Sequence, residues 1–199
     1  MAKSRMLDYG TVATRPGNVS LSRKKLLRIQ PEVVATLPNV IAWLILRQVR
    51  VILAYKNYMR EHLARGDSQP AVVVSVDPLI VAAYSGELDC VALLSFDPIF
   101  TKDYSLQVGS RLLSVNSYTS GSEVAPDLTA GPDQCHRWVN FTPFIADFLS
   151  DDMDRITERK RAIDESEWQK AMSMGLVALR EHPDKVRNGQ PVDCGGPAA

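Results

Sequence analysis

The chain has 199 residues, of which 45% are hydrophobic and 23% charged, so it can bury an ordinary core and is not globally disordered. The longest apolar runs, 40–46 and 79–84, are far shorter than the roughly 18 residues that a membrane span requires. With a net charge of zero and no apolar stretch typical of a secretion signal near its start, the chain is expected to be a soluble, cytoplasmic single domain.

Charge is unevenly distributed along the chain. Residues 1–28 carry seven basic residues and one acid, whereas residues 77–154 carry twelve acids and three basic residues. Opposite fields attract over about a Debye length. We therefore expect the basic segment to lie against the acidic part of this chain or of a neighbour. Residues 1–19 show no periodicity and are predicted to form a flexible basic arm.

A short helix is predicted directly after this arm, because Ser20 or Ser22 can cap it and Pro31 ends it. It carries the basic residues that we expect to contact a partner: Arg23, Lys24, Lys25 and Arg28. A nucleic-acid partner is a weaker hypothesis than a protein, because no aromatic cluster accompanies these residues and the later part of the chain is acidic.

The segment 39–65 runs without a helix breaker to Gly66 and is predicted to be one long helix. Apolar residues recur along it at helical spacing: Ile41, Leu44, Ile45, Ile52, Tyr55, Met59 and Leu63. Its first half is apolar nearly all round, so we expect it to be the central, most buried element. Any apolar face left uncovered would drive self-association or docking onto a partner.

Short apolar runs punctuated by turn residues follow Gly66 and predict four or five antiparallel strands. The first three runs are 71–76, 79–85 and 88–96, and Gly86 suits the turn between the second and third. A second hairpin is expected around Gly109.

Residues 119–134 are rich in Ser, Gly, Pro and Asp, which is typical of a long exposed loop. The segment 142–149 is predicted to form a short helix that begins at Thr142, and a longer helix is expected over 151–182. The domain is therefore expected to span 20–186, with a flexible tail over 187–199.

The pattern of "VVVSVDPLIV" returns twenty residues later in "ALLSFDPIFT", which places Asp77 and Asp97 in equivalent positions. Paired carboxylates at one sheet edge would suit catalysis. The nineteen residues between them, however, hold two strands and a turn, which leaves no room for a crossover helix. Asp-Pro commonly initiates turns, so we predict that both aspartates reverse the chain.

Cys135 and His136 place a thiol beside an imidazole, but neighbouring residues on a strand point to opposite faces, so this pair is a weak catalytic candidate. The three cysteines and three histidines show no metal-ligand spacing, and no phosphate-binding glycine loop is present. We therefore expect no metal and no cofactor.

The predicted fold is α+β, with four or five antiparallel strands on a long central helix, a C-terminal helix and the N-terminal basic arm. The leading hypothesis is a non-catalytic intracellular binding or assembly protein, which contacts a protein partner or itself through its arms, long loop and helix face. No membrane partner is expected. A small hydrolase-like enzyme using Asp77, Asp97 and His136 is the alternative, followed by a nucleic-acid-binding accessory protein.

Overall fold

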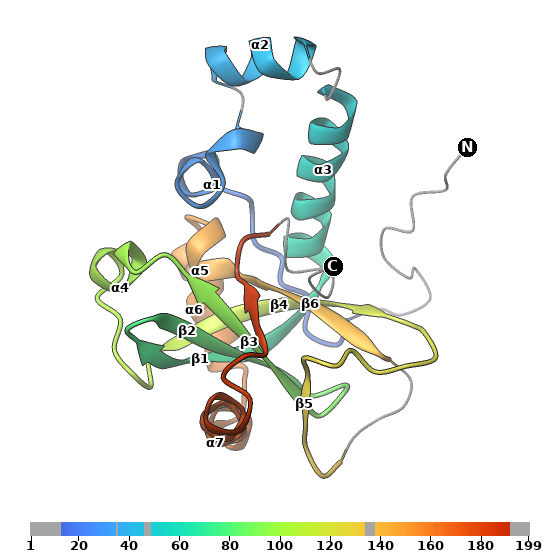
Figure 1. Cartoon of the computed structure of the whole chain (residues 1–199), viewed down its shortest axis with the longest axis vertical. Helices are drawn as coiled ribbons and strands as arrows, with labels where there is room; N and C mark the ends of the chain where they lie inside the picture. The colour runs from blue at the N-terminus through green and yellow to red at the C-terminus, as the bar shows by residue number, and fades with distance from the viewer. Residues whose placement is uncertain (1–12, 35, 46–48, 134–137, 192–199) are drawn as a thin grey trace.

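The computed structural model describes residues 13–191 except 35, 46–48 and 134–137, and its fold is α+β (Figure 1). A curled, mainly antiparallel sheet has the strand order β5-β3-β2-β1-β4-β6, and β7 pairs in parallel with β3. The strands are β1 (Asp67–Val76), β2 (Leu79–Ser85), β3 (Cys90–Phe96), β4 (Arg111–Thr119), β5 (Thr129–Ala130), β6 (Asn140–Ile145) and β7 (Val186–Asn188). The sheet is therefore larger than the four or five strands expected.

Seven α-helices are described: α1 (Arg23–Ile29), α2 (Leu37–Ile45), α3 (Val49–Arg65), α4 (Ile99–Asp103), α5 (Ala146–Leu149), α6 (Met153–Arg161) and α7 (Glu165–Glu181). Ser22 caps α1 as predicted, because its side chain accepts a hydrogen bond from the Lys25 backbone. The expected C-terminal helix is divided into α6 and α7, because Asp164 begins α7 through a capping box with Glu167.

The predicted central helix differs most from the structure. It is described as two helices, α2 and α3, and α3 stands away from the sheet with α2 lying across its far end (Figure 1). Only the last turns of α3 are buried, at Met59, His62 and Leu63. The apolar first half of the predicted helix is consequently not the centre of the core.

Two further local predictions were wrong. Gly109 lies in the turn before β4, with a φ of 89°, and α4 rather than a strand precedes that turn. The segment from 142 continues β6 and forms only the four-residue helix α5. In the second place the local pattern allowed either element, and pairing of β6 with β4 decided the outcome.

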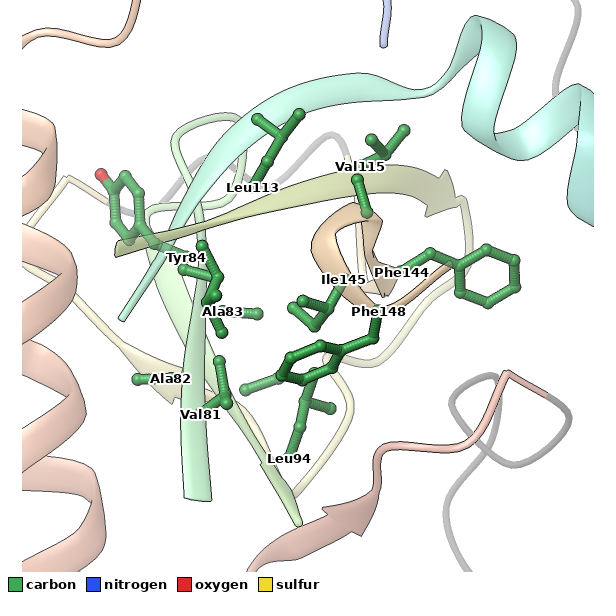
Figure 2. Close-up of a cluster of buried hydrophobic side chains, with 14 of the residues drawn as sticks. Val81, Ala82, Ala83, Tyr84, Leu94, Leu113, Val115, Phe144, Ile145 and Phe148 are labelled. Atoms are coloured by element: carbon green, nitrogen blue, oxygen red, sulfur yellow. The ribbon is translucent and has the colours of Figure 1, made fainter. Parts of the chain in front are cut away.

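The core lies inside the curl of the sheet. β2 is buried along its whole length, so its alternating side chains have apolar surroundings on both faces. Figure 2 shows Val81 directed toward Leu94, Ile145 and Phe148, while Ala82 points to the opposite side, where α7 packs. Figure 1 shows α7 on the outer face of the sheet.

The close approach of α7 depends on Gly175. A Cβ atom at this position would overlap the Cβ of Ala82 and meet Val74 at 3.0 Å. The absence of a side chain therefore lets the helix backbone lie directly on β1 and β2, which excludes water from the outer face of these strands.

An aromatic cluster fills the end of the sheet beside α4 and α5. The ring of Phe148 is fully buried, with centroids 5.0 Å from those of Phe96 and Phe100 and 4.9 Å from that of Tyr104. These separations and tilted geometries are those at which aromatic rings attract one another. The cluster thus joins β3, α4 and α5 into one packed unit.

Both ends of the described chain pack more extensively than the predicted boundaries imply. Gly17, Asn18 and Val19 donate backbone hydrogen bonds of 2.9–3.3 Å to carbonyls at the end of α3, although 1–19 was expected to be a flexible arm. At the other end, β7 (Val186–Asn188) extends two residues into 187–199, which was expected to be a flexible tail.

Arg187 on β7 closes the curl of the sheet. β7 pairs with β3, and the Arg187 guanidinium donates hydrogen bonds of 2.8 Å to the Phe141 carbonyl and to Asn140, both on β6 at the opposite sheet edge. The same guanidinium forms an ion pair with Asp127. The buried guanidinium of Arg187 therefore holds together β7, β6 and the loop that carries Asp127.

Candidate functional site

The two repeated aspartates lie in turns. The Asp97 carboxylate accepts a 2.9 Å hydrogen bond from the backbone of Ile99, which is the turn geometry predicted for it. Asp77 is exposed in the two-residue connection between β1 and β2, where Val76 pairs with Leu79. Each aspartate thus lies where the chain reverses direction.

Asp97 also lines a hollow of about 510 Å³ between α1, α4 and the ends of β3 and β7. The hollow is formed by Arg28, Ile29, Pro31, Ser95, Phe96, Asp97, Phe100, Asn188 and Gln190. Asp77 is not among these residues. Cys135 and His136, the other proposed reactive residues, lie outside the described part of the chain. The structure therefore does not bring the predicted carboxylates together around this hollow.

Part of the predicted partner-binding segment contacts the body of the same chain. Lys25 donates hydrogen bonds of 2.8 and 2.5 Å to the carbonyls of Asp147 and Ser150 at the end of α5. Burial lowers the pKa of Lys25 against the opposing effect of nearby carboxylates. Arg28 forms an ion pair with Asp103. The other two residues of the predicted contact are exposed: Arg23 and Lys24.

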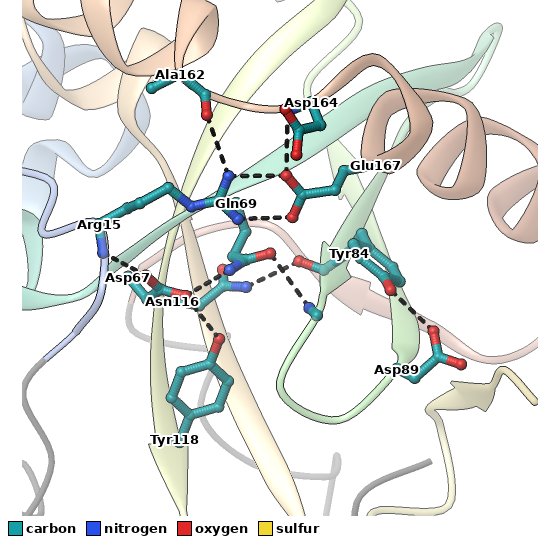
Figure 3. A network of polar contacts seen from close by, with 11 residues as sticks. Arg15, Asp67, Gln69, Tyr84, Asp89, Asn116, Tyr118, Ala162, Asp164 and Glu167 are labelled. Carbon is teal, nitrogen blue, oxygen red and sulfur yellow. Dashed lines mark hydrogen bonds and ion pairs between the residues drawn. The ribbon is translucent and has the colours of Figure 1, made fainter. Parts of the chain in front are cut away.

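A polar network connects the N-terminal segment to the sheet and to α7 (Figure 3). The Arg15 guanidinium binds both oxygens of Glu167, at 2.6 and 2.7 Å. Its backbone N–H donates to Asp67, which also accepts hydrogen bonds from Gln69 and Tyr118. Burial raises the pKa of Asp67, and these donors partly oppose the rise. The network fixes residues 13–19 against β1.

A second group of polar residues surrounds Asp89 at the turn after β2. Lys170 lies 2.7 Å from one carboxylate oxygen, and the Tyr84 hydroxyl donates to the same oxygen at 2.8 Å. The Asp133 backbone donates to the other oxygen at 2.7 Å. Burial opposes ionisation of Asp89, but the hydrogen bond from Lys170 and the other donors outweigh it and lower its pKa. These contacts connect the loop that carries Asp133 to Lys170 on α7 through Asp89.

His62 is the fully buried histidine at the end of α3. Its Nε2 lies 2.7 Å from the Val115 carbonyl, and its Nδ1 lies 3.3 Å from the hydroxyls of Tyr58 and Ser117. The imidazole stacks on Phe144 with ring centroids 3.9 Å apart. Burial lowers the pKa of His62 to about 4, so the ring is neutral at neutral pH and Nε2 donates to the carbonyl. Its contacts anchor α3 on β4 and β6.

These polar clusters connect distant segments of the described chain. Among the described residues, no group of three or more His, Cys, Asp or Glu side chains is arranged to hold a metal ion. Cys90 is buried, and burial raises the pKa of its thiol to about 12. Its thiol is therefore a poor nucleophile.

Among the described residues, five large apolar side chains are at least half exposed, and four of the five lie on one projection of the molecule. We call α2 and α3 together the helical arm. Four large apolar side chains of the arm are exposed: Ile41 (50%), Leu44 (63%), Val51 (67%) and Leu53 (54%). Three residues are similarly exposed but lie singly on other elements: Val108 in the turn before β4 (50%), Ile99 on α4 (49%) and Met153 on α6 (49%). The arm therefore provides the larger candidate surface for contact with another molecule.

Comparisons with known proteins give little further information. No protein-family model and no curated protein matches the chain. It is similar to the crystal structure of a putative membrane protein from Corynebacterium diphtheriae, with 18% identity, a TM-score of 0.42 and coverage of 59% of this chain and 94% of that chain. Similarity at this level defines neither a shared fold nor a shared activity. In the described part of the present chain, no helix has the length and apolar character needed to cross a membrane.

Proposed function

We propose that this protein is a non-catalytic binding protein that uses the helical arm as its docking surface. The observation that carries the proposal is the exposure of Ile41, Leu44, Val51 and Leu53 on two consecutive helices. Exposed apolar area has an unfavourable free energy in water, which is recovered when a partner covers it. Scattered apolar residues are common on surfaces, whereas a concentration on one projection is typical of an interaction site.

The polar interior supports the same proposal. Asp67, Asp89, His62 and Arg187 each make hydrogen bonds that join segments far apart in sequence. All four side chains are buried, so none presents an atom at the surface within hydrogen-bond reach of a substrate. The hydrolase-like alternative would need Asp77 and Asp97 in a common hollow, and only Asp97 contributes to the one described above.

The proposal can be tested by photo-crosslinking in cells that express the protein. A photoreactive amino acid replaces Leu44 in one variant and Val108 in the other, so both probes start from exposed positions. We expect adducts from position 44 and few from position 108. A protein, a second copy or a lipid would each be seen as a defined mass increase. Equal labelling at the two positions, or no adduct at position 44, would contradict docking through the arm.

A further inference from the structure

We propose that α2 inserts into the headgroup region of an anionic lipid bilayer, while Arg50 and Lys56 in the first half of α3 contact the lipid phosphates. The inference rests on the proposed docking function and names its partner. It also revises the expectation that the protein has no membrane partner: that expectation concerned spanning helices, whereas this contact is peripheral.

The first observation is the chemistry of α2. Its nine residues, "LPNVIAWLI", contain no charged side chain, and Ile41 and Leu44 are at least half exposed. A helix of this length extends about 14 Å, which is too short to cross the roughly 30 Å hydrocarbon core of a bilayer. A short apolar helix of this kind can lie in the plane of the interface, with its exposed residues at the boundary between headgroups and acyl chains.

The second observation is the position of α2. Figure 1 shows that it lies across the far end of α3, at the end of the longest dimension of the molecule and away from the sheet. The far side of α2 can therefore approach a flat surface before the other described elements do. The other end of α3 is anchored on the body, where Met59 and Leu63 are fully buried. The helix α3 therefore holds α2 away from the sheet.

The third observation is the charge of the arm. Residues 37–65 contain five basic residues and one acid, a net charge of +4 in a chain whose total is zero. On α3, Arg50 and Arg60 are exposed and Lys56 is half-buried. Burial lowers the pKa of Lys56, and the nearby positive charges of Arg60 and Arg23 add to this effect. Of these cations, Arg50 in the first turn of α3 lies closest along the chain to the apolar α2, where an anionic surface would stabilise its charge.

The charge favours a lipid surface over a second copy of the arm. Two arms that paired face to face would bring two charges of +4 together, and such like-charge contacts oppose association. An anionic bilayer supplies the opposite charge together with an apolar layer for Ile41 and Leu44. Both halves of the arm, the uncharged α2 and the basic α3, thus find a complementary environment in one partner.

The test uses the full chain and vesicles of phosphatidylcholine with or without phosphatidylglycerol. We expect sedimentation with the anionic vesicles only, and weaker binding at high salt. The double variant Ile41→Glu/Leu44→Glu should lose binding to the background level. The variant Arg50→Gln/Lys56→Gln should bind about tenfold more weakly, because each cation near the surface adds to the affinity.

Matched variants control for general effects of these changes. Val108→Glu introduces a carboxylate at a position as exposed as Ile41, and Arg180→Gln removes a cation whose side chain is 73% exposed on α7. Both should bind the vesicles like the wild type. Circular dichroism and thermal unfolding should show that all variants are folded, since the altered side chains are exposed or half-buried.

The outcomes separate this inference from the proposed function. Absence of vesicle binding, combined with concentration-dependent self-association that Ile41→Glu/Leu44→Glu abolishes, would overturn the lipid inference and leave the arm as a docking surface. Absence of vesicle binding together with crosslinks from position 44 to another protein would do the same. Absence of binding, self-association and crosslinks would overturn both. Vesicle binding that the arm variants retain would also overturn the inference.

Discussion

Replacing Arg187 with Met is expected to lower the free energy of unfolding by about 3–5 kcal/mol. The Arg187 side chain is 4% exposed, and its guanidinium binds Asp127, the Phe141 carbonyl and Asn140. Met keeps much of the apolar volume but leaves a partly buried carboxylate and a carbonyl without their donor. Urea unfolding monitored by tryptophan fluorescence measures the change.

The matched control for this change is Arg180→Met. Arg180 is 73% exposed and its ion pair is with the neighbouring Glu181, so its replacement should change the free energy of unfolding by about 0.5 kcal/mol or less. Asp127→Asn should give an intermediate loss, because it keeps the side-chain shape but removes the negative charge. A loss of less than about 1 kcal/mol for Arg187→Met would contradict the role of Arg187 in closing the sheet.

The second expected result is a loss of stability as the pH falls from 6.5 toward 4. His62 titrates near 6.5 in the unfolded chain and at about 4 in the folded protein, where burial opposes the charged ring. Between pH 6.5 and pH 4 the unfolded state binds more protons than the folded state, because only its His62 is charged. His62 therefore does not reduce the free energy of unfolding above pH 6.5, and it reduces it progressively as the pH falls toward 4. The difference between the two pKa values of His62 corresponds to a loss of about 3 kcal/mol in the free energy of unfolding. Urea unfolding at a series of pH values measures it.

The variant His62→Gln separates this effect from the carboxylates. Its amide can donate to the Val115 carbonyl but does not titrate, so its stability should depend much less on pH between 4 and 6.5 than that of the wild type. Asp67 acts in the opposite direction, because its raised folded pKa adds stability as the pH falls. An equal pH dependence in wild type and His62→Gln would show that His62 is not the responsible group.

Local signals in the sequence predicted much of the sheet. The runs 71–76, 79–85 and 88–96 correspond to β1, β2 and β3, and the turn at Asp97 has the predicted side-chain hydrogen bond. Each of these features depends on residues within a few positions of one another. Apolar runs and turn residues are therefore sufficient to locate them.

Long-range pairing could not be predicted in the same way. β7 has three residues and pairs in parallel with β3, about ninety positions earlier, so no periodicity marks it. The role of Arg187 follows from that pairing and was missed with it. A basic residue close to Pro, Gly and Asn resembles an exposed tail when only its neighbours in sequence are considered.

The helical arm shows a different limit of sequence reasoning. The spacing of Ile41 and Leu44 indicates a helix with an apolar surface, and α2 is a helix. The same spacing cannot show whether another part of the chain covers that surface. The sequence pattern therefore led to the expectation of a buried central helix, while the alternative of docking through an uncovered face is the one that the exposed residues support.

The accessibility of position 44 tests the central claim most directly. A Leu44→Cys variant, with Cys135 and Cys194 replaced by Ser, retains only the buried Cys90, whose raised pKa makes it unreactive. Maleimide labelling of the purified protein should be fast, because Leu44 is 63% exposed. We predict much slower labelling in gently opened cells, where a partner covers the arm, and fast labelling of a Val108→Cys control in both samples. Equally fast labelling of position 44 in the two samples would contradict the account.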